Sequence, residues 1–178
     1  MRIVGGLHKG RRFNPPKFFK ARPTTDFAKE SLFNLIDNRI DLEDRKVLDL
    51  FSGTGSISYE FISRGCNYVM AVDVNARYLS FIEKTAKTLE PERKILRTYK
   101  GNAFSILKKM DLDYDLIFAD PPYDIPNLEI LPDLIFENKS LKENCIVIIE
   151  HSSQNDFSNH PRFQEKRHYG KVNFSFFS

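Results

Sequence analysis

The sequence is poor in cysteine and has no long hydrophobic run. Its two cysteines, Cys66 and Cys145, lie far apart in apolar surroundings, which favours small core residues in a reducing compartment over disulfides or a metal site. The longest apolar run, residues 145–149, has the length of a buried strand, whereas a membrane span needs about 18 residues. Arg2 is not followed by the apolar stretch of a secretion signal. We therefore expect a cytoplasmic monomer with neither a membrane partner nor a bound metal.

Internal repeats and low-complexity tracts are also missing. With 178 residues, the chain has the size of one ordinary domain, or of a domain with an added arm. Hydrophobic residues make up 41% of the chain and charged residues 29%. This balance is typical of globular proteins and excludes wholesale disorder.

Acidic side chains are absent from the first 25 residues, and the first acid is Asp26. Seven basic residues precede it: Arg2, Lys9, Arg11, Arg12, Lys17, Lys20 and Arg22. The rest of the chain therefore contains the other 20 of the 27 basic residues and all 24 acidic residues, so its net charge is −4. A basic arm on a mildly acidic body favours contact with a polyanion; an arm that only aids solubility is the alternative. We predict an arm over residues 1–24 and a folded domain over residues 25–178.

The arm has the pattern of a short β-hairpin, because residues 3–4 and 11–13 flank a glycine-rich turn. Beyond it, Thr25 or Asp26 can cap a helix that continues to about Asn38. The apolar residues at helical spacing in this segment are Phe27, Leu32, Phe33, Leu35 and Ile36.

From residue 46 onward, apolar runs alternate with amphipathic segments. The apolar runs are residues 47–51, 68–73, 95–99, 114–119 and 145–150, and the helical patterns between them cover about 56–64, 76–89, 104–110 and 128–137. Near-continuous apolar strands that alternate with helices predict a parallel sheet covered on both faces. Residues 162–169 and 172–177 around a Gly170-Lys171 turn predict a closing hairpin. The expected fold is α/β, with a mostly parallel seven-stranded sheet and an antiparallel hairpin at its edge.

Ligands of such sheets bind at the carboxyl ends of the strands, and the first run ends in a loop with Asp49, Gly53 and Gly55. The two glycines let the backbone turn sharply and approach a ligand closely. Ser58 stands where a dinucleotide-binding loop has its third glycine, and no lysine follows as in a phosphate-binding loop. Asp49 favours a cationic ligand, such as the methionine part of S-adenosylmethionine, although Gly-x-Gly turns also serve packing alone.

The next two runs end in further polar residues. Asp73 closes the second run, where an acid can bind both hydroxyls of a ribose or can cap the following helix. Asn102 follows the third run and can accept a hydrogen bond from an adenine amino group, while Phe104 can lie on the adenine ring. A simple loop is the alternative for this third segment.

The fourth run ends in Asp120-Pro121-Pro122-Tyr123. An exocyclic amine of a nucleobase is a poor nucleophile, because its lone pair is delocalised into the ring. The Asp120 carboxylate and a carbonyl held rigid by the two prolines can accept both N–H groups and orient the lone pair on a methyl carbon. The carboxylate also stabilises the positive charge that develops on the nitrogen, and Tyr123 offers a ring for stacking the base. A proline turn without function is the alternative.

Together, the motifs that follow Asp49, Asp73, Gly101 and Asp120 resemble class I S-adenosylmethionine-dependent amino-methyltransferases, which have a Rossmann-like fold. The two ends of the chain narrow the resemblance to the RsmD family, the bacterial 16S ribosomal RNA guanine-N2 methyltransferases. The segments that carry this second resemblance are residues 2–6, 9–12, 22–24, 32–34, 63–65, 150–151 and 169–170. The resemblance covers essentially the whole chain.

The resemblance implies methyl transfer from S-adenosylmethionine to N2 of a guanine in 16S ribosomal RNA within a small ribosomal subunit particle. It implies a catalytic role for Asp120, Pro121, Pro122 and Tyr123. With RNA as the substrate, the charge of the arm predicts an RNA-docking role for its seven basic residues. The residues expected to bind the cofactor are Thr24, Asp49, Phe51, Gly53, Gly55, Asp73, Val74, Asn102, Ala103 and Phe104.

The sequence departs from the family pattern at a few positions and leaves other functions open. Asn102 replaces the usual acid, Ile57 and Ser58 replace small residues, and Ala119 replaces a larger apolar residue. A DNA adenine-N6 or cytosine-N4 methyltransferase uses the same four residues from Asp120 on but needs an added recognition domain. A methyltransferase for glutamine side chains typically has Asn in place of Asp120. A non-catalytic RNA-binding module with a vestigial fold is the alternative outside the enzymes, and Ser58 disfavours hydride transfer.

Overall fold

A computed structural model of the chain describes residues 1–19 and 25–178, and these form one seven-stranded sheet with helices on both faces. The strand order is β3-β2-β1-β4-β5-β7-β6. The strands are β1 Lys46–Leu50, β2 Tyr68–Asp73, β3 Leu96–Lys100, β4 Leu116–Ala119, β5 Ile146–His151, β6 Phe163–Tyr169 and β7 Val172–Phe177. The first five strands are parallel, while β7 runs antiparallel to β5 and β6. The predicted parallel sheet with an antiparallel edge hairpin is confirmed.

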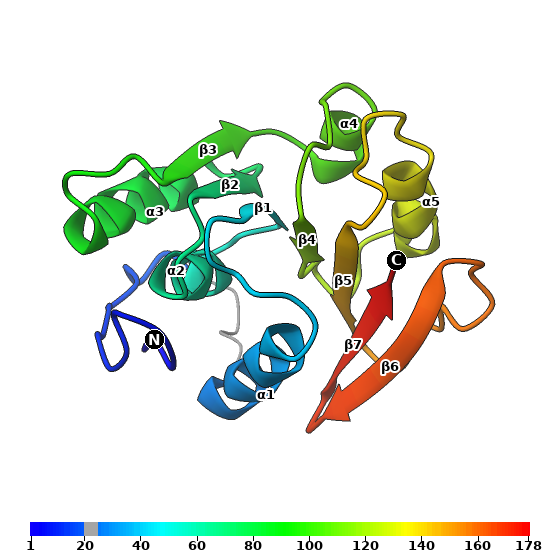
Figure 1. Cartoon of the computed structure of the whole chain (residues 1–178), viewed down its shortest axis with the longest axis horizontal. Coiled ribbons are helices and arrows are strands. Elements are labelled where there is room, and N and C mark those ends of the chain that lie inside the picture. The colour runs from blue at the N-terminus through cyan, green and yellow to red at the C-terminus, as the bar shows by residue number, and fades with distance from the viewer. Residues whose placement is uncertain (20–24) are drawn as a thin grey trace.

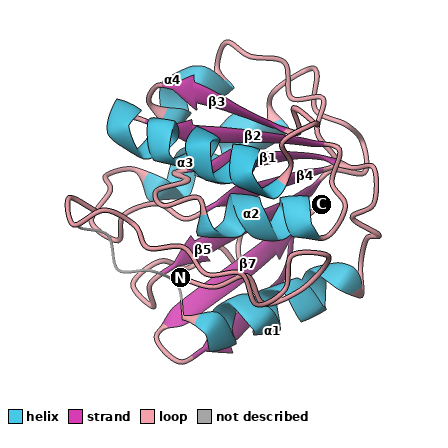
Figure 2. Ribbon diagram, turned by 90° about the vertical axis from the view of Figure 1, so that its left-hand side faces the viewer, coloured by secondary structure: helices cyan, strands magenta, loops and turns pink. Residues whose placement is uncertain are grey.

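The helices lie in two groups, one on each face of the sheet (Figures 1 and 2). They are α1 Asp26–Asp37, α2 Ser56–Ser63, α3 Ala76–Leu89, α4 Ala103–Leu107 and α5 Leu131–Phe136, with a single 3₁₀ turn, η1 Leu128–Ile130, before α5. The helices α1, α2 and α3 cover one face, and α4 and α5 cover the other. Each face has its own buried apolar cluster, because alternate residues of every buried strand point to opposite sides.

Helix α1 begins where the sequence predicts. The hydroxyl of Thr25 accepts a hydrogen bond of 3.2 Å from the backbone N–H of Ala28, so Thr25 is the N-cap. Ala28, Leu32 and Ile36 are buried against the sheet. Phe27, which the apolar spacing includes in the core-facing stripe, is instead 67% exposed. The helical period of 3.6 residues explains this error, because it places Ala28 on the face of Leu32 and turns Phe27 away from it.

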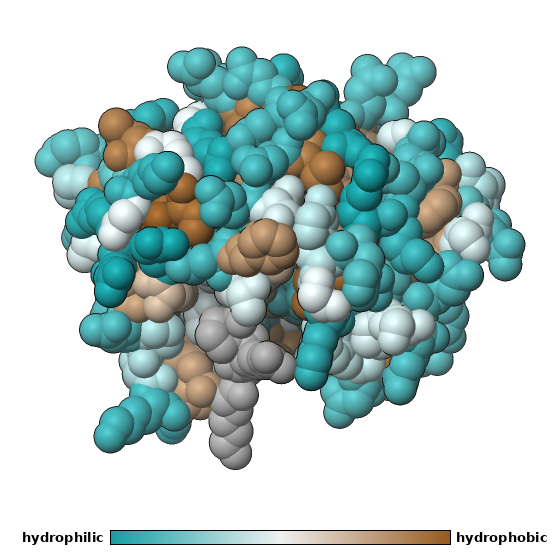
Figure 3. Space-filling model, turned by 90° about the horizontal axis from the view of Figure 1, so that it is seen from below, coloured by the Kyte–Doolittle hydropathy of each residue, from teal (hydrophilic) through white to brown (hydrophobic). Residues whose placement is uncertain are grey.

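The N-terminal segment folds back on itself as a short hairpin. The backbone N–H of Ile3 donates to the carbonyl of Arg11, and that of Phe13 donates to the carbonyl of Met1, both at 3.0 Å. Arg2 and Arg12 form a single antiparallel bridge, so the predicted hairpin is present as a turn with one bridge and no longer ladder. The N-terminus lies on the same side of the molecule as α1 (Figure 1). From that side, most of the surface is hydrophilic, with separate hydrophobic patches (Figure 3).

This hairpin is tied to α2 by a buried ion pair that the sequence patterns do not indicate. Glu60 of α2 accepts hydrogen bonds from the backbone N–H groups of Val4 at 2.6 Å and Gly5 at 3.2 Å. Lys29 of α1 places its Nζ 3.0 Å from the same carboxylate, and both side chains are at most 1% exposed. Lys29 also donates to the carbonyl of Arg2. One ion pair therefore joins α1, α2 and the hairpin.

Both cysteines are free and buried, as expected. Burial raises the pKa of the Cys66 and Cys145 thiols to about 12, which keeps them protonated and unreactive at neutral pH. None of the helices formed by the described residues has the length and apolar character of a membrane span.

Candidate active site

Four parallel strands carry an acidic residue at or next to their carboxyl ends. These acids are Asp49 of β1, Asp73 of β2, Asp120 directly after β4, and Glu150 of β5. Strand β1 lies between β2 and β4, so the direction in which strands are added reverses there. In open α/β sheets, ligands bind at the carboxyl ends of the strands beside this reversal. The fold therefore brings the acids predicted from three separate motifs to one edge.

The loop after β1 has the backbone conformation that the glycines predict. Phe51, Gly53 and Gly55 all have positive φ, of 60°, 50° and 76°. A Cβ on Gly55 would come within 2.8 Å of Ile82 and of the Tyr59 ring, so the α2–α3 packing requires glycine there. Phe51 adopts a left-handed conformation without being glycine, a strain that is concentrated at functional sites.

Asp73 is tied to this loop. Its Oδ2 accepts a hydrogen bond of 3.0 Å from the backbone N–H of Gly53, and its Oδ1 accepts one of 2.8 Å from Asn75. The N-cap of α3 is Asn75, whose side chain accepts from the N–H of Arg77. Asp73 is therefore not the helix cap that the sequence left as an alternative, and each carboxylate oxygen keeps a lone pair for a ligand hydroxyl. Val74, the next residue, is 63% exposed.

Asp49 is only 1% exposed, and its partner is Ser58. The Ser58 hydroxyl donates a short hydrogen bond to Oδ2 of Asp49. Burial raises the pKa of Asp49 to about 7; the hydrogen bond from Ser58 opposes this, and the charges of Asp120 and Asp73 add to it. Ser58, which replaces the third glycine of a dinucleotide-binding loop, therefore supports the Asp49 carboxylate. The sequence patterns do not reveal this role. The only signal for it is a hydroxyl nine residues after Asp49, near the end of β1.

The segment after β3 contributes the N-cap of α4 and an aromatic ring. Asn102 is exposed, and its side-chain oxygen accepts a hydrogen bond of 3.2 Å from the N–H of Ser105. Ala103 is buried at the first position of the helix. The ring of Phe104 lies 6.3 Å from that of Phe51, nearly perpendicular to it. Two of the residues predicted to bind a cofactor, from the first and third motifs, thus contact each other.

The Asp120-Pro121-Pro122-Tyr123 segment leaves the sheet at the end of β4. The backbone N–H of Asp120 donates to the carbonyl of Leu50 at 3.3 Å, which places this acid beside the start of the glycine loop. The carbonyl of Pro122 closes a turn by accepting from the N–H of Ile125 at 3.0 Å. Burial raises the pKa of the Asp120 carboxyl. Tyr123 is 51% exposed, at the outer end of the motif.

The whole chain is similar to a known protein family and to several of its members. The family model described as "Conserved hypothetical protein 95" matches residues 1–178. The chain is 33% identical over 156 residues to YlbH of Bacillus subtilis, covering 86% of this chain and 84% of that one. It is 30% identical over 150 residues to "Ribosomal RNA small subunit methyltransferase D" of Buchnera aphidicola, covering 84% and 75%. The chain belongs to the RsmD family.

The solved structures confirm the fold of this RsmD-family member. The structure of yhhF from Escherichia coli superposes with a TM-score of 0.84 at 25% identity and covers 99% of this chain and 96% of that one. The chain thus has the class I methyltransferase fold, which is Rossmann-like, as the sequence predicts. The superposition includes the N-terminal hairpin as well as the sheet.

Five of the seven basic residues of the arm lie within the described part of this RsmD-family chain, and all five are on its surface. Arg2, Lys9, Arg11, Arg12 and Lys17 are all exposed, while Lys20 and Arg22, together with Thr24, lie outside the described residues. Although the arm itself contains no acid, Arg2 is paired with the first acid after it, since its Nε lies 3.1 Å from Asp26. Arg11 is also engaged, because it donates to the carbonyl of Thr88 at 3.1 Å.

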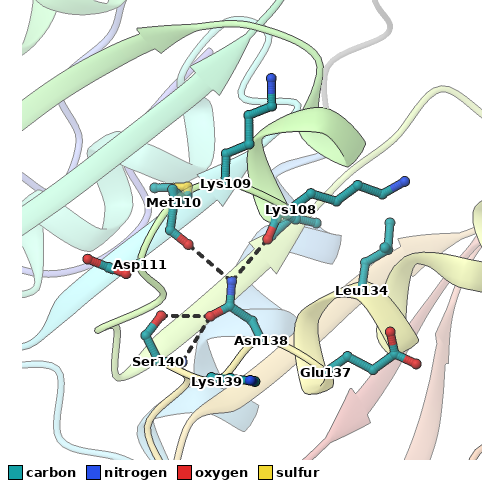
Figure 4. Close-up of a pocket in the computed structure, with 10 residues that line it drawn as sticks. Lys108, Lys109, Met110, Asp111, Leu134, Glu137, Asn138, Lys139 and Ser140 are labelled. Atoms are coloured by element: carbon teal, nitrogen blue, oxygen red, sulfur yellow. Dashed lines mark hydrogen bonds between the residues drawn. The ribbon is translucent and has the colours of Figure 1, made fainter.

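A surface hollow among the described residues lies away from this edge. It has a volume of about 510 Å³ and lies between the last residues of α4 and α5 (Figure 4). Asn138 closes one side of it by donating to the carbonyls of Leu107 and Met110, both at 3.0 Å. These segments precede β4 and β5, so the hollow is at the amino ends of the strands. It is a packing feature of the helix ends and not part of the acidic edge.

Proposed function

We propose that this RsmD-family protein transfers a methyl group from S-adenosylmethionine to N2 of a guanine in 16S ribosomal RNA. The observation that carries the proposal is the position of Asp120-Pro121-Pro122-Tyr123 beside the glycine loop, joined to β1 by the Asp120–Leu50 hydrogen bond. The name of the Buchnera relative, a methyltransferase of small-subunit ribosomal RNA, supports the RNA substrate.

The residues at the carboxyl edge fit S-adenosylmethionine. This cofactor carries an ammonium group and a sulfonium, and the Asp49 carboxyl of β1 can provide negative charge before the glycine loop. Asp73, fixed by Gly53, has acceptor capacity for the ribose hydroxyls. The cofactor supplies an electrophilic methyl group on its sulfur.

The adenine would lie by the segment after β3. Phe51 and Phe104 provide aromatic surface for it, and exposed Val74 provides apolar surface. Asn102 uses one lone pair of its side-chain oxygen for Ser105, and the second can accept from the adenine amino group. Buried Ala103 lets the helix approach closely.

The target amine is oriented by Asp120 and the rigid backbone after it. Because the carbonyl of Pro122 is used in a turn with Ile125, we assign the carbonyl of Pro121 as the second acceptor of the amine. Two acceptors fixed in this way direct the nitrogen lone pair out of the base plane. Asp120 stabilises the positive charge on the nitrogen and takes up the proton that the nitrogen loses. Tyr123 contributes its ring to the stacking of the base.

The arm supplies the docking surface for the RNA. The five described basic residues of residues 1–19 are exposed, and the buried Lys29–Glu60 pair holds the hairpin on the domain. A basic surface held in a fixed place contributes phosphate contacts that position the RNA without reading its sequence. We propose that a monomer docks in this way on the small-subunit particle in the cytoplasm.

The proposal is tested with purified protein, S-adenosylmethionine labelled in its methyl group, and small-subunit particles from cells that lack the modification. Digested RNA should contain labelled N2-methylguanosine, and Asp120→Ala should abolish its formation while calorimetry shows cofactor binding retained. Deproteinised 16S RNA, tested in parallel, should be methylated less. Label in N6-methyladenosine or N4-methylcytidine, or turnover near the wild-type rate in the Asp120 variant, would contradict the proposal.

A further inference from the structure

Glu150 is a buried acid beside Asp120 to which the proposed function gives no task. In the parallel pairing of β4 with β5, Ala119 is the partner of Ile149. Asp120 and Glu150 are the next residues of the two strands, so their side chains leave the same face of the sheet. Neighbouring strands are about 4.8 Å apart. The register therefore places the two carboxyl groups next to each other.

The Glu150 side chain is almost entirely shielded from solvent, and one of its carboxyl oxygens has no hydrogen-bond partner. The residue is 3% exposed, and on its other side β7 pairs it with fully buried Phe174. Its Oε2 has no hydrogen-bond partner within the described ranges 1–19 and 25–178. An ionised oxygen left in this state would be costly. This buried site therefore favours the protonated form of the Glu150 carboxyl, which has one O–H group that can donate a hydrogen bond.

The charged groups around the pair are acids. Asp49 on β1 interacts with Asp120, and Asp73 lies beyond it at the end of β2. Burial first, and the charge of Asp120 second, raise the pKa of Glu150. Lys29, the buried cation of α1, is occupied by Glu60.

The strand on the far side of Glu150 brings no cation either. The β7 residues paired with residues 149–151 are Ser175, Phe174 and Asn173. The Nδ1–H of His151 donates to the carbonyl of Ser152, and its Nε2 is hydrogen-bonded to the hydroxyl of Ser175, both at 2.8 Å. Burial lowers the pKa of His151. Two adjacent carboxyl groups in such surroundings share one proton.

We propose that Glu150 is a positioning residue for methyl transfer: its neutral carboxyl lies beside Asp120 in the β4–β5 register and turns Oε2, which is unpaired in this structure, to donate a hydrogen bond to the Asp120 carboxylate, which holds that carboxylate toward the target amine. The deeper residue keeps the proton, while Asp120, at the edge of the sheet, is ionised. A charge-assisted hydrogen bond of this kind is short and directional. Only the role of the pair in orienting the target amine rests on the proposed function; the pairing of Glu150 with Asp120 does not.

The pair can be observed without any substrate. We would label the carboxyl carbons of Asp and Glu with ¹³C and follow their NMR shifts with pH in the wild type and in Asp120→Asn. Glu150 should stay protonated at pH 7 in the wild type, and its titration midpoint should fall by about 1 pH unit when the neighbouring charge is removed. A Glu150 midpoint near that of an exposed glutamate, or one that Asp120→Asn leaves unchanged, would overturn the proposal.

Kinetics then test the positioning. Glu150→Gln keeps a donor that cannot ionise, so its kcat at pH 7 should stay within about threefold of the wild type, whereas Glu150→Met should lose about tenfold in kcat at unchanged KM. The wild-type kcat should fall at alkaline pH as Glu150 ionises, and this fall should be absent in Glu150→Gln. Glu143→Gln, an exposed residue before β5, is the matched control and should keep the wild-type profile.

The two tests separate the two hypotheses. If the wild type methylates no RNA amine, the proposed function fails, while the NMR titration still measures the Asp120–Glu150 pair. If the wild type is active but Glu150→Met has normal kcat, or Glu150→Gln keeps the alkaline fall, the positioning role is wrong and the proposed function stands.

Discussion

The carboxylate of Asp73 accepts a hydrogen bond of 3.0 Å from the backbone N–H of Gly53. This contact joins the carboxyl end of β2 to the loop after β1, so the acid that we propose to bind the ribose and the loop beside it form one unit. The second oxygen of Asp73 is held by the N–H of Asn75. The carboxylate is thus oriented before any ligand arrives, which lowers the entropic cost of binding.

Replacing Asp73 with alanine should weaken binding of S-adenosylmethionine by about 1.5–3 kcal/mol, because a charge-assisted hydrogen-bond pair to the ribose is lost. Isothermal calorimetry measures the change directly. Asn75→Ala is the control: it removes the cap of α3 and should cost about 1 kcal/mol of stability with little change in cofactor affinity. Equal affinity in Asp73→Ala and the wild type would rule out the ribose assignment.

Cofactor binding should depend on pH through Asp49. Its pKa is about 7 in the folded protein, and a cationic ligand binds the ionised form better. Between pH 5 and 7, affinity should therefore rise with pH, by at most about tenfold per pH unit, and binding should release a proton. Asp49→Asn should bind more weakly at pH 7 and show a flatter pH dependence. The same slope and the same proton release in both proteins, measured in buffers of different ionisation enthalpy, would show that Asp49 does not contact the cationic part of the cofactor.

The Lys29–Glu60 pair should be important for stability. Lys29→Met leaves the Glu60 carboxylate buried without its cation, which should lower the free energy of unfolding by about 3–5 kcal/mol. Urea unfolding gives this value, and Lys84→Met on the exposed side of α3 should change it by less than about 0.5 kcal/mol. Similar stabilities of the two variants would mean that the pair is not needed to hold the hairpin.

The basic arm should determine the salt dependence of RNA binding. Arg12 and Lys17 are exposed, and replacing both with alanine should flatten the slope of log affinity against log salt by about one to two units. Cofactor affinity should not change, because neither residue is assigned to the cofactor. The control is Lys108→Ala with Lys139→Ala, at the hollow on the opposite edge of the sheet. An unchanged slope in the arm variant together with weaker cofactor binding would make the arm a cover for the cofactor site.

Most of the fold was predictable, because the central strands β1, β4 and β5 are buried on both faces and therefore appear as near-continuous apolar runs. The start of a helix was predictable where its N-cap residue was recognisable, as for Thr25 before α1. The end of α4 was not, because this helix ends at Leu107, three residues before the predicted limit. Phe27 shows where an apolar count fails, since a helix of 12 residues exposes some of its hydrophobic side chains.

The placement of the candidate site residues was predictable where a motif follows a strand, as for Asp73 and Asp120, while their roles stay predictions. The buried contacts were not, because Lys29, Glu60 and Ser58 are polar residues at positions that a pattern assigns to the surface or to a loop. Their partners are 9 to 56 residues away, and only the packing of α1 and α2 on the sheet brings them together.

The most direct test of the central claim is mass spectrometry of nucleosides from 16S ribosomal RNA of cells with and without this protein. We expect N2-methylguanosine to be lost in the deletion strain, restored by the wild-type gene, and not restored by Asp120→Ala. Unchanged N2-methylguanosine with loss of a methylated adenosine or cytidine would contradict the account.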